Sequence, residues 1–305
     1  MSFASETKLE LCKVKPQRPC CRKAECYGLL LFGRNFSGHA LTLATENGAV
    51  AHRVAQLTAE DMGVIVDITT SILRRREYKN AYTVSVKGSD EIKKVLSFFG
   101  HSQNEINLRI NRANIENECC QSAFLRGVFL YCGTVTNPKK DYRIEFVVPY
   151  MNLAKDLYGF LSEIYELDLK PGIIKRKGSF VVYVKGSERT ADLLTYIGAV
   201  KASMVLMQAK MFKEVRNNVN RKTNFETANI DKTASAAAAQ IIAIDKIKKA
   251  IGISALPEEL QELAVLRYHN PEMSLRELGE QLSEPISRSG VNHRLQRIVE
   301  ISKGL

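Results

Sequence analysis

A polar stretch close to the C-terminus carries the side chains best suited to binding nucleic acid. Between Ile286 and Ile298 the chain has three arginines, one histidine and no acidic residue. Guanidinium groups donate to phosphates and base edges, while amides and hydroxyls can both donate and accept there. We therefore predict DNA contacts from Ser287, Arg288, Ser289, Asn292, His293, Arg294, Gln296 and Arg297. No nucleophile or metal-binding motif accompanies His293, so contact with DNA or solvent is favoured over general base catalysis.

The spacing of apolar residues places this stretch on one helix. Val291, Leu295 and Ile298 recur at i, i+4 and i+7, the period of a buried helical face. If those three residues face inward, the opposite face carries Ser289, His293, Gln296 and Arg297, with Arg288, Asn292 and Arg294 on its flanks.

Two further helices are predicted before it. Pro257 suits a first helical position, and Asn270 ends that helix. Ser274 to Glu277 has the pattern of a capping box, and Ser283 to Ile286 forms a short turn. Three short helices with a tight turn before the last predict an all-α helix-turn-helix domain over residues 251–305. The alternative is a protein-binding bundle, which the domain's 8 acidic against 6 basic residues would favour.

The charge of the whole chain favours a polyanionic partner. The formal net charge is +11, and residues 201–250 hold 10 Lys and Arg against 4 Asp and Glu. Basic proteins commonly bind nucleic acid, although charge alone is weak evidence. We predict that 201–250 is a basic helical linker, with a mobile hinge in the polar segment Asn217 to Asp231.

Seven cysteines could bind a soft metal or form disulfides. No signal-peptide core precedes them, so we expect reduced thiols in the cytoplasm. A zinc site from Cys12, Cys20, Cys21 and Cys26 is conceivable, but the chain has no CxxC pair. The doublet Cys20-Cys21 recurs 99 residues later as Cys119-Cys120, which favours buried packing over metal binding. We therefore expect no metal, no cofactor and no small-molecule substrate.

An internal repeat organises the first two thirds of the chain. Val84 to Ser89 is echoed by Val182 to Ser187, and Gly28 by Gly127. Each copy, over 1–112 and 113–200, predicts the order α-β-β-α-β-β-α. In the first copy we expect helices over 21–32, 58–73 and 89–99, a hairpin of strands 40–45 and 49–55 around Asn47-Gly48, and two strands within 75–87. In the second we expect helices over 118–132, 151–166 and 188–198, with strands flanking 137–140 and over 171–176 and 179–185.

The repeat carries a family resemblance. Tyr27 to Gly33 and Arg126 to Gly133 resemble degenerate copies of the helix that names the LAGLIDADG homing endonucleases. The resemblance implies an α+β fold in which two such helices pack through Gly28 and Gly127. It also implies two four-stranded sheets whose exposed faces form a saddle over duplex DNA.

The acidic residues that such nucleases use for metal binding are absent. The resemblance aligns their positions with Gly33 and Cys132, and neither 29–36 nor 126–136 contains Asp or Glu. Mg²⁺ prefers carboxylate oxygens, so we predict that the chain is not an enzyme.

Cations at the ends of the predicted strands could still contact phosphates. They fall at comparable places in the two repeats and comprise Arg74, Arg75, Arg76, Lys79, Lys175, Arg176 and Lys177. The alternative, weighed evenly, is that they are solvated strand ends. A protein partner of the saddle, such as RNA polymerase or a sigma factor, is also left open.

Two segments extend the resemblance to a more specific family. Ser287 to Leu295, behind the degenerate helix pair, and the opening Ser2 to Lys8 resemble the WhiA family of bacterial regulators. The resemblance implies a transcription factor linked to sporulation in some Gram-positive bacteria and to cell division and chromosome segregation in others. We expect a nucleoid-associated protein that binds double-stranded DNA and no membrane. A nucleoid architectural protein and a metal-dependent homing endonuclease are the alternatives.

Overall fold

The computed structural model describes residues 2–74, 78–105 and 107–305. The chain forms two compact units, Met1–Lys213 and Glu214–Leu305, and each is described by itself. No helix in the described residues combines the length and apolar character needed to cross a bilayer.

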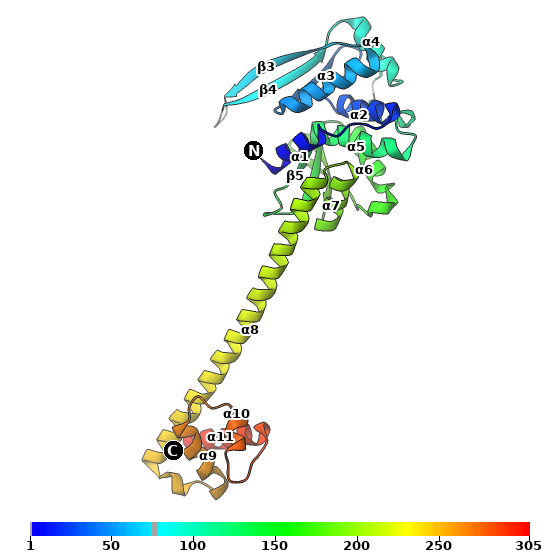
Figure 1. The fold of residues 1–305 in the computed structure, drawn as a ribbon. Helices are drawn as coiled ribbons and strands as arrows, with labels where there is room; N and C mark the ends of the chain where they lie inside the picture. Colours follow the sequence, from blue (N-terminus) through cyan, green and yellow to red (C-terminus); the bar gives the residue numbers. More distant parts are fainter. Residues whose placement is uncertain (1, 75–77, 106) are drawn as a thin grey trace. The chain divides into compact units, whose positions relative to one another are not determined.

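The first unit contains the predicted repeat twice, behind a short helix α1 (Phe3–Leu11). The first copy consists of α2 (Pro19–Leu31), β1 (Asn35–Phe36), β2 (Leu41–Thr45), α3 (Gly48–Met62), β3 (Val66–Arg74), β4 (Tyr78–Val86) and α4 (Ser89–Phe98). The second consists of α5 (Glu118–Cys132), β5 (Gly133–Val135), β6 (Arg143–Val148), α6 (Met151–Ser162), β7 (Gly172–Arg176), β8 (Ser179–Lys185) and α7 (Ser187–Tyr196). Helices α2 and α5 lie side by side (Figure 1). The predicted order of elements is confirmed in both copies.

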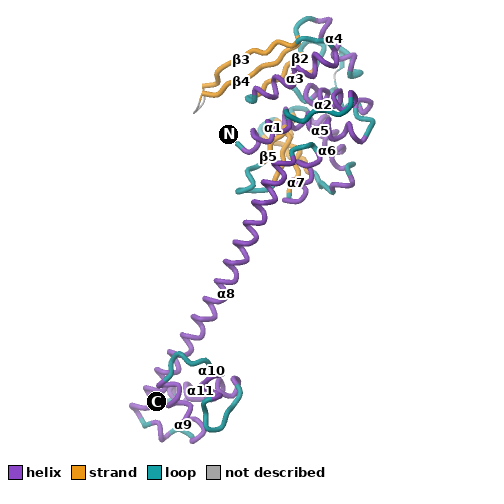
Figure 2. The backbone as a smooth tube through the Cα atoms, in the orientation of Figure 1, coloured by secondary structure: helices purple, strands orange, loops and turns teal. Residues whose placement is uncertain are grey.

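Each copy forms an antiparallel four-stranded sheet with the same topology. The strand orders are β1-β2-β4-β3 and β5-β6-β8-β7. Alternate residues face a helix-covered core, as Val84 and Val86 do in β4 and Val182 and Val184 in β8. The β3–β4 pair extends past the end of α3 (Figure 2). The intervening residues, such as Ser85 in β4 and Tyr183 in β8, are partly exposed on the opposite face of each sheet.

The first copy corrects the predicted boundaries between residues 46 and 87. Among the described residues of 75–87, where two strands were predicted, only β4 is present, because β3 already ends at Arg74. Asn47 does not begin a hairpin turn: its side chain caps α3 by accepting from the Ala49 amide at 3.0 Å. Val50, Val54 and Leu57 are buried at helical spacing, so residues 49–55 are helix rather than strand. The predicted helix over 58–73 was wrong beyond Met62, because β3 begins at Val66. Its Thr- and Ile-rich sequence suits a strand.

The long helix α8 (Val200–Ala250) replaces the predicted hinge. Asn217 to Asp231 is helical throughout, and it contains neither Gly nor Pro. Polar residues keep such a segment exposed without interrupting the backbone hydrogen bonds, so polarity was the wrong signal for a break.

The second unit consists of the later part of α8 and three short helices. These are α9 (Glu258–His269), α10 (Leu275–Glu280) and α11 (Arg288–Lys303). Leu263 of α9, Leu278 of α10 and Val291 of α11 share one apolar core with Ile244 and Ile247 of α8. The predicted three-helix module is confirmed, and α8 supplies a fourth wall to its core.

Candidate DNA interface

Local capping interactions set the start of α10 and α11. The Ser274 hydroxyl accepts from the Glu277 amide at 3.3 Å, and the Glu277 carboxylate accepts from the Ser274 amide at 2.8 Å. This is the predicted capping box. The Ser287 hydroxyl accepts from the Gly290 amide at 3.3 Å, so Ser287 caps α11 as expected.

Close packing at Gly279 fixes the turn between these helices. A Cβ at this position would lie 2.4 Å from the Ile286 carbonyl oxygen and 3.0 Å from the Val291 side chain. Only glycine leaves room for that approach. Val291, Leu295 and Ile298 are then fully buried, as predicted. The amino end of α11 is therefore held rigidly against α10.

Most of the predicted DNA-contact residues lie exposed on α11 and its cap. The exposed set comprises Ser287, Arg288, Ser289, Asn292, His293, Gln296 and Arg297. The Ser287 and Ser289 hydroxyls lie 2.9 Å apart. This helix and its cap thus expose amides, hydroxyls, an imidazole and guanidinium groups. These groups are the ones that proteins use to contact bases and phosphates.

Two of the predicted arginines are engaged by the preceding helix. Arg297 forms an ion pair with Glu259 of α9 at 2.7 Å, and the half-buried Arg294 donates to the Glu259 carbonyl oxygen at 3.2 Å. Arg297 was predicted to lie on the outward face without a partner, because an i, i+4 pattern within one helix does not show contacts between helices. Both members of the ion pair are about half exposed. Such a pair contributes at most about 1 kcal/mol, so phosphate can compete with Glu259.

Arg267 was not predicted from the sequence as a structural residue, yet its side chain is only 2% exposed. It donates to the Gln240 amide oxygen of α8 at 2.9 Å and to the Met273 carbonyl oxygen before α10 at 2.6 Å. Burial lowers the pKa of Arg267. A basic residue in the last turn of a helix is usually solvated, so no sequence signal identifies this role.

The predicted phosphate-binding cations of the second sheet lie at one hairpin. Lys175, Arg176 and Lys177 are exposed at the β7–β8 turn, where Lys177 and Gly178 both have positive φ. Arg176 also forms an ion pair with Glu145 at 3.4 Å. In the first sheet Arg74 ends β3 and Lys79 lies near the start of β4. Arg75 and Arg76 lie outside the described residues.

The exposed face of the second sheet holds further cations that the sequence analysis missed. Arg143 and Lys185 stack on the Tyr183 ring, at 4.3 Å and 5.0 Å from its centroid. These residues come from β6 and β8 and meet only when the strands pair. Glu145 forms an ion pair with Arg143, with 2.9 Å between the charged atoms, and so neutralises part of this charge. A cationic and aromatic surface is suited to contacting a nucleic-acid backbone.

The predicted packing of α2 on α5 through two glycines is present in the structure. A Cβ on Gly28 would lie 2.4 Å from the Phe124 carbonyl oxygen, and one on Gly127 only 2.1 Å from that of Glu25. The two helix backbones therefore touch, and any larger residue would separate the repeats.

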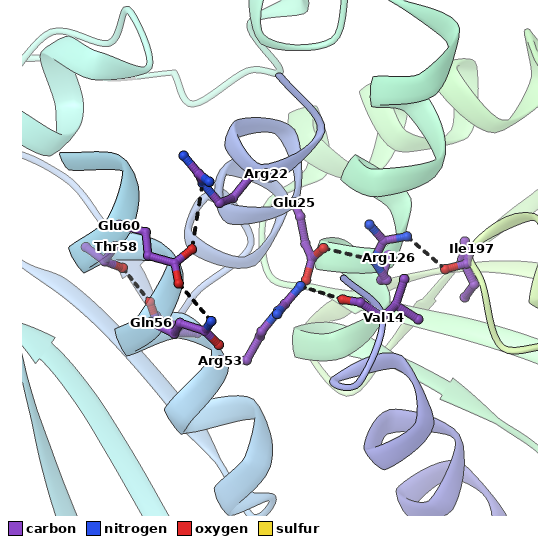
Figure 3. A network of polar contacts seen from close by, with 10 residues as sticks. Val14, Arg22, Glu25, Arg53, Gln56, Thr58, Glu60, Arg126 and Ile197 are labelled. Atoms are coloured by element: carbon purple, nitrogen blue, oxygen red, sulfur yellow. Dashed lines mark hydrogen bonds and ion pairs between the residues drawn. The ribbon is translucent and has the colours of Figure 1, made fainter. Parts of the chain in front are cut away.

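A buried charge network lies beside these glycines. Glu25 is fully buried and accepts from Arg53 at 2.8 Å and from Arg126 at 2.9 Å. Figure 3 shows the two guanidinium groups reaching the same carboxylate from α3 and α5. They also donate to the backbone carbonyls of Val14 and Ile197. This network links the two repeats, and both oxygens of its one carboxylate are paired with guanidinium groups.

The carboxyl ends of α2 and α5 differ from a metal-dependent nuclease centre. Gly33 comes after Phe32, the C-cap of α2, and Cys132 is the last residue of α5. The Lys8 ammonium from α1 donates to the Tyr131 carbonyl oxygen at 3.2 Å. Burial lowers the pKa of Lys8, and burial raises the pKa of Cys132 to about 12. These ends thus present an amine and a thiol rather than hard oxygen ligands.

Comparison with known proteins assigns the chain to a family. The family model of the WhiA LAGLIDADG-like domain matches residues 36–117 and 121–216, and that of the WhiA C-terminal HTH domain matches residues 219–302. The chain belongs to the WhiA family. Two relatives named "Probable cell division protein WhiA" share this length: one from Alkaliphilus metalliredigens is 35% identical over 99% of this chain and 98% of its own. The other, from Thermoanaerobacter sp., is 38% identical over 100% of this chain and 98% of its own.

Solved WhiA structures have the same fold. Full-length DUF199/WhiA from Thermatoga maritima gives a TM-score of 0.61 at 24% identity, covering 100% of this chain and 99% of that one. The N-terminal LAGLIDADG domain of a DUF199/WhiA protein gives 0.50 at 19% identity, over 65% and 90%. The tandem LAGLIDADG-like repeats followed by a helix-turn-helix domain are therefore the WhiA architecture, as predicted.

Proposed function

We propose that this WhiA protein is a sequence-specific DNA-binding transcription regulator in which α11 lies in the major groove of the duplex. The observation that carries the proposal is the exposed polar surface of α11 around Asn292, His293 and Gln296, in a segment, 286–298, without acidic residues. The Ser287 cap and the close contact at Gly279 hold this helix in place. Amides such as those of Asn292 and Gln296 pair with adenine edges, and Arg288 suits guanine or phosphate.

The proposed process is cell division and chromosome segregation, or sporulation. Two relatives that span nearly the same length are named probable cell division proteins, which favours the first. A regulator of this kind would lie in the cytoplasm, associated with the nucleoid.

The saddle is proposed to add affinity without reading sequence. Arg176 and Lys177 are exposed at the β7–β8 hairpin, and the Tyr183 stack is partly exposed on the same sheet, so both suit phosphate contact. Lys175 pairs with Phe180 and therefore lies on the helix-covered face. Binding of RNA polymerase or a sigma factor by the same surface is the competing role. It predicts that substitutions there leave DNA affinity unchanged.

The LAGLIDADG-like repeats are proposed to be non-catalytic. Gly33 and Cys132 offer no carboxylate, and Lys8 places an amine at the end of α5. A divalent metal would meet repulsion rather than hard ligands there. Incubation of supercoiled plasmid with the protein and Mg²⁺ should leave the plasmid intact, whereas nicking or linearisation would refute this assignment.

Competition binding separates the proposed regulator from an architectural protein. Genome-wide mapping of the bound chain first supplies candidate sites. A labelled duplex carrying one such site is then displaced with unlabelled site or with random duplex. A regulator should need at least about a thousandfold more random DNA than specific DNA. Equal displacement by both duplexes would favour the architectural alternative.

A further inference from the structure

Four thiols converge where the amino ends of α2 and α5 meet. Cys20 and Cys21 lie in the first turn of α2, and Cys119 and Cys120 in that of α5. Their four Sγ atoms all lie within 4.8 Å of one another, and those of Cys20 and Cys119 are 4.0 Å apart. Nowhere else in the described residues do three or more histidine, cysteine or acidic side chains gather closely enough to hold a metal.

The spacing of these sulfurs matches a tetrahedral thiolate site. Zinc–sulfur bonds of about 2.3 Å in a tetrahedron place the sulfurs about 3.8 Å apart. The observed cluster would need to contract by about 1 Å or less, which small side-chain rotations can supply. We propose that Cys20, Cys21, Cys119 and Cys120 together bind one zinc ion. An all-sulfur ligand set favours zinc over Mg²⁺ or Ca²⁺.

The surrounding dipoles suit a negatively charged metal centre. Four thiolates around Zn²⁺ carry a net charge of −2, and both doublets lie at helix amino ends, where the helix dipole is positive. The side-chain amide nitrogen (Nδ2) of Asn117 lies 3.9 Å from the Cys120 sulfur and can donate to a thiolate. Arg18, which precedes α2, adds positive charge near Cys119. Such outer contacts orient metal ligands.

Packing alone explains only half of the cluster. Cys21 and Cys120 are buried, as the interpretation of the doublets as core residues predicts. Cys20 and Cys119 are partly exposed, yet their sulfurs turn toward each other. Of the zinc ligands considered from sequence, Cys12 and Cys26 are not in this group. The packing of the two repeats brings the doublets together. A motif of closely spaced cysteines, such as CxxC, cannot reveal ligands that lie 99 residues apart in the sequence.

Metal analysis of the full-length chain tests the proposal. The protein is purified without chelator, under reducing conditions, from zinc-supplemented medium. One zinc ion per chain is expected by elemental analysis. Cys20→Ser/Cys119→Ser should lose that zinc, whereas the matched variant Cys12→Ser/Cys132→Ser should retain it. Retention by the first variant would show that the metal is bound elsewhere.

Cobalt substitution and thiol counting keep the proposal falsifiable if the first variant does not fold. Metal-free parent protein titrated with Co²⁺ should gain the sulfur-to-cobalt charge-transfer absorption of a tetrahedral thiolate site, and zinc should abolish it. Zinc should also protect four thiols from alkylation. Absence of the cobalt spectrum, iron in place of zinc, or a Cys20–Cys119 disulfide in the reduced preparation would overturn the assignment.

Discussion

The buried carboxylate of Glu25 shows how a single residue joins the two repeats. Its partners Arg53 and Arg126 come from different repeats and are themselves buried. Removing one member of such a network leaves uncompensated charge in the core, which typically destabilises a protein by about 3–5 kcal/mol.

Glu25→Gln should therefore lower the free energy of unfolding by about 3–5 kcal/mol in urea denaturation. Glu60→Gln is the matched control, since the Glu60 side chain is 42% exposed and its carboxylate lies 3.8 Å from the Arg22 guanidinium. It should change stability by less than about 1 kcal/mol. Equal effects of the two substitutions would show that burial of the network is energetically unimportant.

Asp156 gives a pH-dependent test on the segment that joins the repeats. Burial would raise its pKa, but hydrogen bonds from Arg109 and from the Ile110 amide outweigh that effect, so the pKa of Asp156 lies below its usual value. A lowered pKa in the folded state means that ionised Asp156 stabilises the fold above the unfolded-state pKa of about 4. That stabilisation is lost as the pH falls through the lower, folded-state pKa.

Asp156→Asn should consequently have a lower Tm than the parent at neutral pH. The difference should shrink as the pH falls below about 4. Thermal melts over this range measure it. A Tm difference that grows toward acid pH would contradict a lowered pKa of Asp156 in the folded protein.

At the scale of elements, the glycines of α2 and α5 set the distance between the repeats. Gly127→Ala would place a Cβ 2.1 Å from the Glu25 carbonyl oxygen, and backbone cannot move as a flexible side chain can. We expect a loss of at least about 3 kcal/mol, in the range of severe overpacking, measured by urea denaturation.

Gly159→Ala is the matched control in α6. A Cβ there would meet only the Glu163 carboxylate, at 3.9 Å. Alanine in a helix interior should stabilise by about 0.5–1 kcal/mol. If Gly127→Ala were equally well tolerated, the close helix contact would have no structural importance.

The elements could be predicted from sequence where local signals and tertiary packing agreed. Helix α5 and the strands of the second repeat lie within a few residues of the predicted ranges. The pattern of apolar residues and the turn residues between the strands mark these elements in the sequence. Asn47-Gly48 was mistaken for a hairpin because asparagine suits both a turn and a helix cap. The Glu259–Arg297 pair and the thiol cluster depend on contacts between elements, which periodicity in one segment does not encode.

At the scale of the whole molecule, we propose that α11 selects the DNA sequence and that the saddle adds affinity. Each lysine or arginine contact with a phosphate of duplex DNA contributes about 0.9 to the slope of log K against log salt. Arg176→Ala/Lys177→Asn should reduce the slope by about 1–2 while preserving site preference. Asparagine is chosen at 177 because it tolerates the positive φ there.

The control for charge is Lys93→Ala/Lys94→Ala, which removes two exposed lysines from α4. Helix α4 is not part of the exposed sheet faces, so this variant should keep the slope of the parent. Equal slopes for all three proteins would remove the saddle from the DNA interface and favour a protein partner for it.

The most direct test of the central claim is the affinity of an α11 variant for a mapped genomic site and for random duplex. Asn292→Ala/Gln296→Ala should weaken binding to the site by about tenfold to a hundredfold or more, because a bidentate base contact contributes about 1–3 kcal/mol. Its affinity for random DNA should be unchanged, and the control Asn217→Ala/Asn218→Ala on α8 should bind both as the parent does. Parent-like affinity of the α11 variant for its site would contradict the assignment of sequence recognition to this helix.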